Sequence, residues 1–104
     1  MVCLVSIIIS KNIEDVVVDW LLEQEGLTGF NSIPVNGYGL GEKHMSISEK
    51  VTGRTARVMF QFHIEEMQAE TILLNLKSDF PGSDIHYMVT PLKSAGNLSS
   101  FIEL

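Results

Sequence analysis

Basic residues gather in one stretch of an otherwise acidic chain. Four of the seven Lys and Arg residues, Lys43, Lys50, Arg54 and Arg57, stand close together in the sequence. The chain as a whole has 13 Asp and Glu residues and a formal net charge of −6. A local positive patch on a negative protein attracts anions. We therefore predict that this stretch binds a small anion or an acidic segment of a partner protein.

Glycine alternates with other residues just before the basic stretch, at Gly37, Gly39 and Gly41. Glycine allows a backbone with positive φ and lets a ligand come close to the main chain. A connection that only reverses direction needs fewer glycines, so the pattern favours a binding loop over the alternative, a plain hairpin loop. The predicted ligand- or partner-binding loop comprises Gly37, Tyr38, Gly39, Gly41, Lys43, His44, Arg54 and Arg57.

The two arginines have a second interpretation, which the sequence supports equally. Arg54 and Arg57 lie in a predicted strand that is otherwise largely apolar. In this interpretation they form a salt bridge across a subunit interface, to Glu49 or to a carboxylate on a helix, and contact no ligand.

The other chemically active side chains form no spaced motif. Ser, His and Asp residues are present, but none is placed as in a nucleophile elbow, so no enzyme activity is predicted. The candidate metal ligands, Cys3, His44 and His86, are scattered along the chain. Cys3 and His86 become neighbours only if the first and last strands pair in a suitable register. The alternative for Cys3 is a buried thiol that packs as a small apolar side chain.

Composition excludes several classes of protein. A net charge of −6 argues against nucleic-acid binding, which usually requires a basic face. The single cysteine permits no internal disulfide. The apolar run 2–9 is too short to cross a bilayer and follows no basic region, so neither membrane insertion nor a signal peptide is predicted. A length of 104 residues with 45% hydrophobic content suits one cytoplasmic domain, residues 1–104.

Hydrophobic periodicity predicts the elements that position these groups. Strands are expected at residues 2–10, 29–35, 54–62 and 85–90, and helices at 13–25 and 65–79, with the loop at about 40–53 and a short tail at 94–104. Asn12 is expected to cap the first helix and Gly26 to end it. Pro34 places its strand at a sheet edge. In the second helix the expected buried stripe is Met67, Thr71, Leu73, Leu74 and Leu76.

This order, βαββαβ, predicts an α+β, ferredoxin-like fold: a four-stranded antiparallel sheet with two helices on one face. Within the strand 54–62, Ala56, Val58, Phe60 and Phe62 should face the helices, and Thr55, Arg57, Met59, Gln61 and His63 the other side. The first strand is apolar on both faces, so it should lie centrally and leave apolar groups on the sheet face without helices. We expect self-association to bury that open face.

The run from Gly26 to Gly39, with its GxT segment followed by Gly37-Tyr38-Gly39, resembles the second strand of PII-type signalling proteins, where it leads into the long T-loop. The part from Leu74 to Leu92 is similar to CutA-type divalent-ion tolerance proteins. An uncharacterised branch of small PII-like proteins, often associated with heavy-metal efflux systems, looks most similar. The resemblance implies a homotrimer packed through open sheet faces.

Two departures from the PII pattern limit what the resemblance implies. Leu40 stands near the position of a glutamine that helps PII proteins hold nucleotide and magnesium. The turn at 79–84 is acidic where PII proteins carry a phosphate-binding loop rich in glycine and lysine. The expected function is therefore a trimeric regulatory protein that senses a small ligand or contacts a partner, such as a metal-efflux transporter. No particular cofactor is predicted; a weakly held nucleotide, a small anion or a divalent metal would fit. The alternative is a CutA-like protein of divalent-metal binding or metal tolerance.

Overall fold

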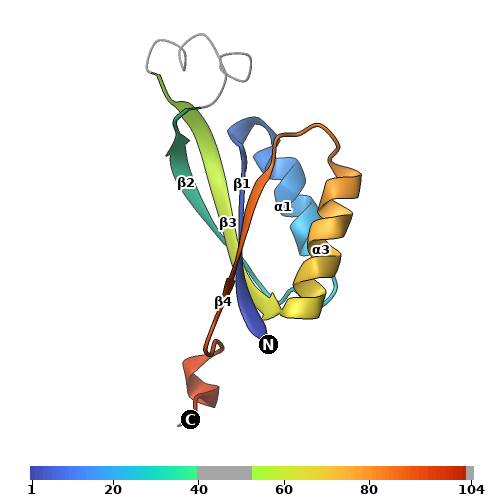
Figure 1. Ribbon diagram of the computed structural model, residues 1–104, viewed down its shortest axis with the longest axis vertical. Helices are drawn as coiled ribbons and strands as arrows, with labels where there is room; N and C mark the ends of the chain where they lie inside the picture. Colours follow the sequence, from blue (N-terminus) through green and yellow to red (C-terminus); the bar gives the residue numbers. More distant parts are fainter. Residues whose placement is uncertain (40–52, 103–104) are drawn as a thin grey trace.

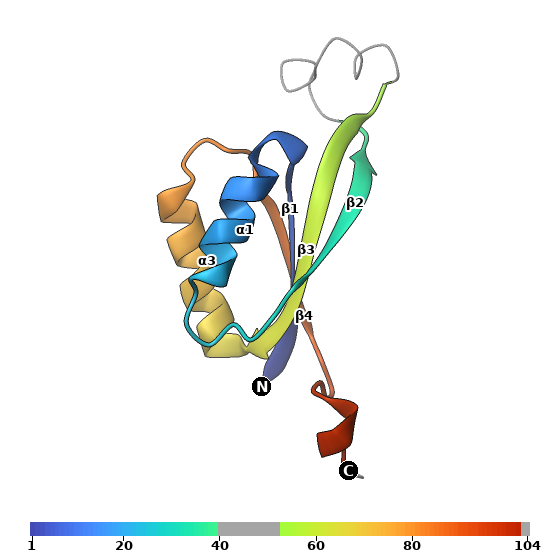
Figure 2. The same cartoon turned by 180° about the vertical axis from the view of Figure 1, so that it is seen from behind.

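Four strands form one antiparallel sheet in the computed structural model, which describes residues 1–39 and 53–102 (Figure 1). The strands are β1 (Val2–Ser10), β2 (Asn31–Gly37), β3 (Thr55–Glu65) and β4 (His86–Pro91), in the order β2-β3-β1-β4. The helices α1 (Glu14–Leu22) and α3 (Glu66–Asp79) lie on the same side of the sheet (Figures 1 and 2). The predicted βαββαβ, ferredoxin-like fold is confirmed.

The core lies between the two helices and the central strands. Each core-facing residue of β1 is buried and pairs with a buried residue of β3, as in Ile7 opposite Phe60 and Val5 opposite Phe62. The buried residues on this face of the strands are Cys3, Val5, Ile7, Ile9, Val58, Phe60, Phe62 and Ile64. The predicted orientation of β3 is thus confirmed, although Ala56, on the same side of the strand, is exposed. The reason is that β1 ends at Ser10, opposite Arg57, so Ala56 lies beyond the end of that strand.

The first helix begins and ends differently from the prediction. The Ser10 hydroxyl accepts a hydrogen bond from the Asn12 N–H at 3.3 Å, which starts a 3-10 turn, Lys11–Ile13, so Asn12 does not cap α1. At the other end α1 stops at Leu22, and the Gln24 side chain donates to the Trp20 carbonyl at 3.0 Å. That bond satisfies one of the carbonyls that a helix end leaves open. Gly26 has a φ of +82°, but in the turn that follows and not directly after the helix.

The buried face of α3 is not the predicted one. Ala69, Ile72 and Leu76 pack on the sheet, whereas Met67 and Leu74 are exposed. Positions three and four apart share one helix face, and a shift of two positions turns a side chain by about 200°. The predicted stripe through Met67 and Leu74 was therefore wrong, although its member Leu76 is buried.

Three strands have slightly different limits from those predicted. The predicted strand 29–35 is observed as β2, which begins pairing at Asn31 and ends at Gly37; 54–62 corresponds to β3 and 85–90 to β4. Phe30 lies just before β2, yet its ring packs edge-on against Phe60 with centroids 5.7 Å apart. β2 is an edge strand, as Pro34 indicated.

The sheet face opposite the helices carries an apolar row across three strands. Ile33 pairs with Met59, and Met59 pairs with Ile8. Nearby, the Gln61 side chain donates to the Ser6 hydroxyl at 3.2 Å, so part of the face is polar and internally satisfied. In Figure 1 both helices lie on the other side of the sheet. Among the described helices, none is long and apolar enough to span a bilayer.

Candidate functional site

Two buried polar residues stand at the start of β3. Thr55 and Arg57 are on the open face by the alternation of the strand, yet they are 3% and 4% exposed. Arg57 lies opposite Ser10 on one side and Val35 on the other, so its main chain is flanked by two strands, β1 and β2. A guanidinium so deeply buried needs partners, because an unpaired buried charge is costly.

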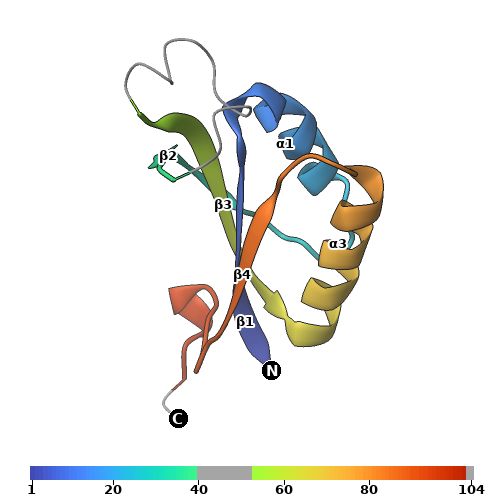
Figure 3. The same cartoon turned by 45° about the horizontal axis from the view of Figure 1, so that its top comes forward.

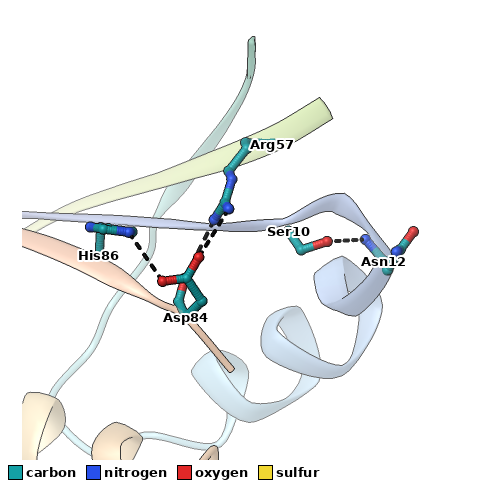
Figure 4. Close-up of polar contacts among 5 residues, drawn as sticks. All are labelled: Ser10, Asn12, Arg57, Asp84 and His86. Carbon is teal, nitrogen blue, oxygen red and sulfur yellow. Dashed lines mark hydrogen bonds and ion pairs between the residues drawn. The ribbon is translucent and has the colours of Figure 1, made fainter. Parts of the chain in front are cut away.

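The partner of Arg57 is the turn that follows α3 (Figure 4). One terminal nitrogen, Nη1, donates to the Asp84 main-chain carbonyl at 3.3 Å, and Nη2 donates to the Asp84 carboxylate at 3.2 Å. The other carboxylate oxygen lies 3.3 Å from His86 Nε2. Asp84 has a φ of +47°, in the left-handed region that Asp tolerates better than most residues.

Arg57 forms an ion pair within its own chain, with Asp84, a residue that the salt-bridge interpretation did not name. Glu49 lies outside the described residues. The reason for the Asp84 contact is topological: β4 pairs with β1, so the turn before β4 returns beside the end of β1 and hence beside Arg57. The acidic composition of the turn 79–84 was the only sequence signal for this pair.

Two atoms of this cluster lack the bonds that buried polar atoms normally make. Arg57 Nε and Thr55 Oγ1 are buried and have no hydrogen-bond partner in the described part of the chain. Leaving such an atom unsatisfied costs about 1–3 kcal/mol. Both atoms can donate a hydrogen bond, and the residues that carry them stand on one face of β3, two positions apart. A buried donor of either kind suits an anionic oxygen, such as that of a carboxylate, a bicarbonate or a phosphate.

The predicted loop residues that the structure describes border this pair of donors. Gly37 ends β2 and pairs with Thr55, so its main chain adjoins the site. Gly39 has a φ of +82° and Gly53 a φ of +73°, and an added Cβ at either would meet no atom within 4 Å. Glycine is thus required at both ends of residues 40–52 by backbone conformation and not by space.

Two further predicted site residues lie outside the buried cluster. Tyr38 and Arg54 are exposed. Gly41, Lys43 and His44 lie outside the described residues. Sequence reasoning missed Thr55 and Asp84 as members of the site: nothing in a threonine at a strand start, or in an aspartate of a turn, distinguishes them before the fold is known.

Cys3 and His86, two of the three predicted metal ligands, do not meet. Cys3 pairs with Pro91 and His86 with Ile8, so the two residues sit at opposite ends of the β1–β4 ladder and on opposite faces. The Cys3 thiol donates to the Ile64 carbonyl at 3.4 Å, and burial raises its pKa. Cys3 is therefore a buried core thiol, the alternative interpretation. His44 is outside the described residues, within which no three His, Cys, Asp or Glu side chains gather as a metal group would require.

Comparison with known proteins agrees with this fold. The chain is similar to a crystal structure of a DUF3240 family protein from Shewanella baltica, with 23% identity, a TM-score of 0.76, and coverage of 93% of this chain and 96% of that one. It is similar to a protein from Thermus thermophilus described as PII-like and signalling, with 20% identity, a TM-score of 0.60, and coverage of 85% and 82%.

A third similar structure is CPII of Thiomonas intermedia, a nitrogen regulatory PII-like protein bound to ADP, AMP and bicarbonate. Its identity is 16% and its TM-score 0.69, over 93% of this chain and 96% of that one. A search of curated proteins gives no significant match. The model of DUF3240, a family of proteins of unknown function, matches residues 1–99. The chain thus has the PII-like fold and belongs to the DUF3240 family.

Proposed function

We propose that the chain is a regulatory binding protein, assembled as a homotrimer, that takes up a small anion at the start of β3 and passes that state to a partner through residues 40–52. The observation that carries the proposal is the pair of buried donors, Arg57 Nε and Thr55 Oγ1, that lack acceptors among the described residues. An oxyanion would supply acceptors to both. The partner, such as a metal-efflux transporter, would read the loop.

Burial of these donors links binding to a change of shape. Each of the two atoms has almost no exposed surface, so a ligand reaches them only when the groups that cover them shift. Residues 40–52, the greater part of the predicted loop, follow Gly39 and precede Gly53 in the connection between β2 and β3, the strands next to the site. A shift at the donors is therefore well placed to alter the loop. The site then has two arrangements, one with the donors covered and one with them accessible. A ligand that binds one arrangement more tightly than the other shifts their populations in proportion to that difference in affinity.

The part of the Arg57 guanidinium that has no partner among the described residues indicates what kind of ligand the site would bind. Arg57 uses its two terminal nitrogens on Asp84, so the Nε edge is the part that remains for an added acceptor. The PII-like relative from Thiomonas intermedia holds ADP, AMP and bicarbonate, all of which present anionic oxygens. The Asp84 carboxylate already next to Arg57 disfavours a highly charged triphosphate, so a small anion such as bicarbonate, or a nucleotide bound weakly, fits better.

Calorimetric titration of bicarbonate, phosphate, AMP and ADP tests the proposal. Arg57→Lys keeps the charge but removes Nε and the planar fork, so we expect at least a tenfold loss of affinity for whichever anion binds, as the loss of one charge-assisted bond predicts. Arg54→Ala, an exposed neighbour, should change affinity only about twofold. Equal affinity of the parent and Arg57→Lys would contradict the proposal.

The homotrimer is tested separately, on the open face. Met59 lies in the centre of the apolar row between Ile33 and Ile8. Met59→Lys places a charge in the proposed interface, so the association constant of the trimer should fall at least tenfold. Light scattering should show this as a shift of the mass from trimer towards monomer. Glu23→Lys, on the exposed surface at the end of α1, is the control and should leave the mass unchanged. A parent that is monomeric at micromolar concentration would contradict the assembly.

A further inference from the structure

A large apolar groove runs between α3 and β4, away from the Arg57 cluster for most of its length. Its volume is about 980 Å³, and its apolar lining includes Leu73, Leu74, Phe80, Ile85, Tyr87 and Val89. Tyr87 is 65% exposed, and every residue of β4 is exposed, although the strand is hydrogen-bonded to β1 throughout. Figure 3 shows why: β4 is the edge strand, and α3 beside it is the nearest helix.

The outer edge of β4 is also without a partner strand in the described sheet. The Leu92 N–H bonds to the Val2 carbonyl at 3.1 Å, so alternation directs the main-chain groups of Tyr87 and Val89 away from β1. The same two residues place their side chains in the groove. Pro91 follows them and offers no N–H, which limits the free edge to a short segment. The groove and edge together suit a short protein segment.

The C-terminal tail has complementary features. Leu98, Phe101 and Ile102 are 85%, 63% and 77% exposed. A 3-10 turn, Leu98–Ser100, orders the first part of this segment: the Asn97 side chain accepts from the Ser99 N–H at 2.9 Å and from the Ser99 hydroxyl at 2.8 Å, and the Phe101 N–H bonds to the Leu98 carbonyl at 3.0 Å. A hydrogen-bonded turn that presents Leu98 and leads directly into Phe101 and Ile102 is a partly preformed contact element, since less conformational entropy is lost on binding.

We infer that the C-terminal turn of one copy docks in the α3–β4 groove of a second copy. The tail leaves the body at the far end of β4, beyond the sheet and away from the helices (Figures 1 and 2). The groove and the tail are therefore two different apolar surfaces of one chain, each lacking a cover among the described residues. A contact between unlike surfaces of identical copies propagates around a ring and closes when the rotation permits. A closed ring is the symmetry of the homotrimer proposed above, but the docking does not depend on any ligand at Arg57.

Disulfide trapping between two single-site variants tests the docking. Leu98→Cys places a thiol on the turn and Leu74→Cys places one in the groove, both at exposed positions that should fold normally. The native Cys3 stays, because its burial and raised pKa keep the thiol unreactive. When the two variants are mixed and oxidised with diamide, we expect a mixed covalent dimer to form at least tenfold faster than in a mixture of Leu98→Cys with Glu23→Cys, whose thiol lies in the exposed turn directly after α1.

Equal rates in the two mixtures would overturn the inference. A chain carrying both Leu98→Cys and Leu74→Cys tests whether the tail docks on its own chain instead. If this variant forms an intramolecular disulfide at a rate independent of protein concentration, the tail folds onto its own groove and the inference is wrong. As a second measurement, the double variant Phe101→Ser, Ile102→Ser should associate at least tenfold more weakly, which light scattering detects as a lower assembled mass. The thermal unfolding midpoint of its monomer should equal that of the parent monomer. Neither result bears on anion binding by Arg57, so the docking and the anion site fail independently.

Discussion

Replacement of Phe60 by alanine is expected to lower the free energy of unfolding by about 4 kcal/mol. Phe60 is fully buried in the middle of β3, between Ile7 on β1 and Ser32 on β2. Its ring also meets Phe30 edge-on, with centroids 5.7 Å apart, so truncation would leave a cavity and remove an aromatic pair. Urea unfolding followed by circular dichroism measures the loss as a lower midpoint at constant slope.

Met67→Ala is the matched control, because methionine and phenylalanine are both large apolar residues that differ here in burial. Met67 is exposed on α3, so its truncation should change the free energy of unfolding by less than about 0.5 kcal/mol. A cost for Met67→Ala similar to that for Phe60→Ala would mean that α3 packs through the Met67 side and not through Ala69, Ile72 and Leu76.

The strands were the most predictable part of the fold. The first strand is observed with the predicted limits, Val2–Ser10, and the alternation of Val58, Phe60 and Phe62 gave the correct core-facing side of β3. The physical reason is the period of two: a strand shifted by one residue would bury its polar set, so a buried face leaves little freedom. The same alternation also predicted which residues of β3 lie on the sheet face without helices.

The face of α3 was not predictable from periodicity alone. Its sequence, EMQAETILLNLKSD, has apolar residues on more than one side, and Ile72, Leu73 and Leu74 are consecutive. Two different stripes thus satisfy a helical period, and the small residue Ala69 is the one that allows the helix to lie close to the sheet. The choice depends on packing against β1 and β3, which no local pattern contains.

The clustering of basic residues in the sequence indicated where the candidate site lies, but not which residues Arg57 contacts. The basic cluster drew attention to Arg57, yet its partner lies 27 positions away in a turn that reaches it only through the β1–β4 pairing. The two buried donors without acceptors in the described part of the chain were also beyond sequence reasoning. Whether a polar atom is satisfied depends on burial and on small differences in distance, which only the folded chain defines.

Replacement of Asp84 by alanine is expected to lower the free energy of unfolding by about 3 kcal/mol, near the low end for a broken buried pair because the aspartate side chain is 36% exposed. The change removes the carboxylate from a guanidinium that is only 4% exposed, and it keeps a residue with a side chain at a φ of +47°. Asp84→Asn tolerates that backbone and keeps a neutral acceptor, so it should cost less, about 2 kcal/mol. Urea unfolding of both variants gives the comparison.

A double variant separates the charge from the shape of the site. Arg57→Met with Asp84→Asn removes both charges while a flexible apolar side chain fills most of the space of the arginine, so stability should return to within about 1 kcal/mol of the parent. Anion binding should be lost in the same variant, because no guanidinium remains to meet the oxygens. If Asp84→Ala alone proves neutral, the Arg57 charge is satisfied without Asp84. If the double variant still binds bicarbonate or AMP as tightly as the parent, the anion site lies elsewhere on the chain.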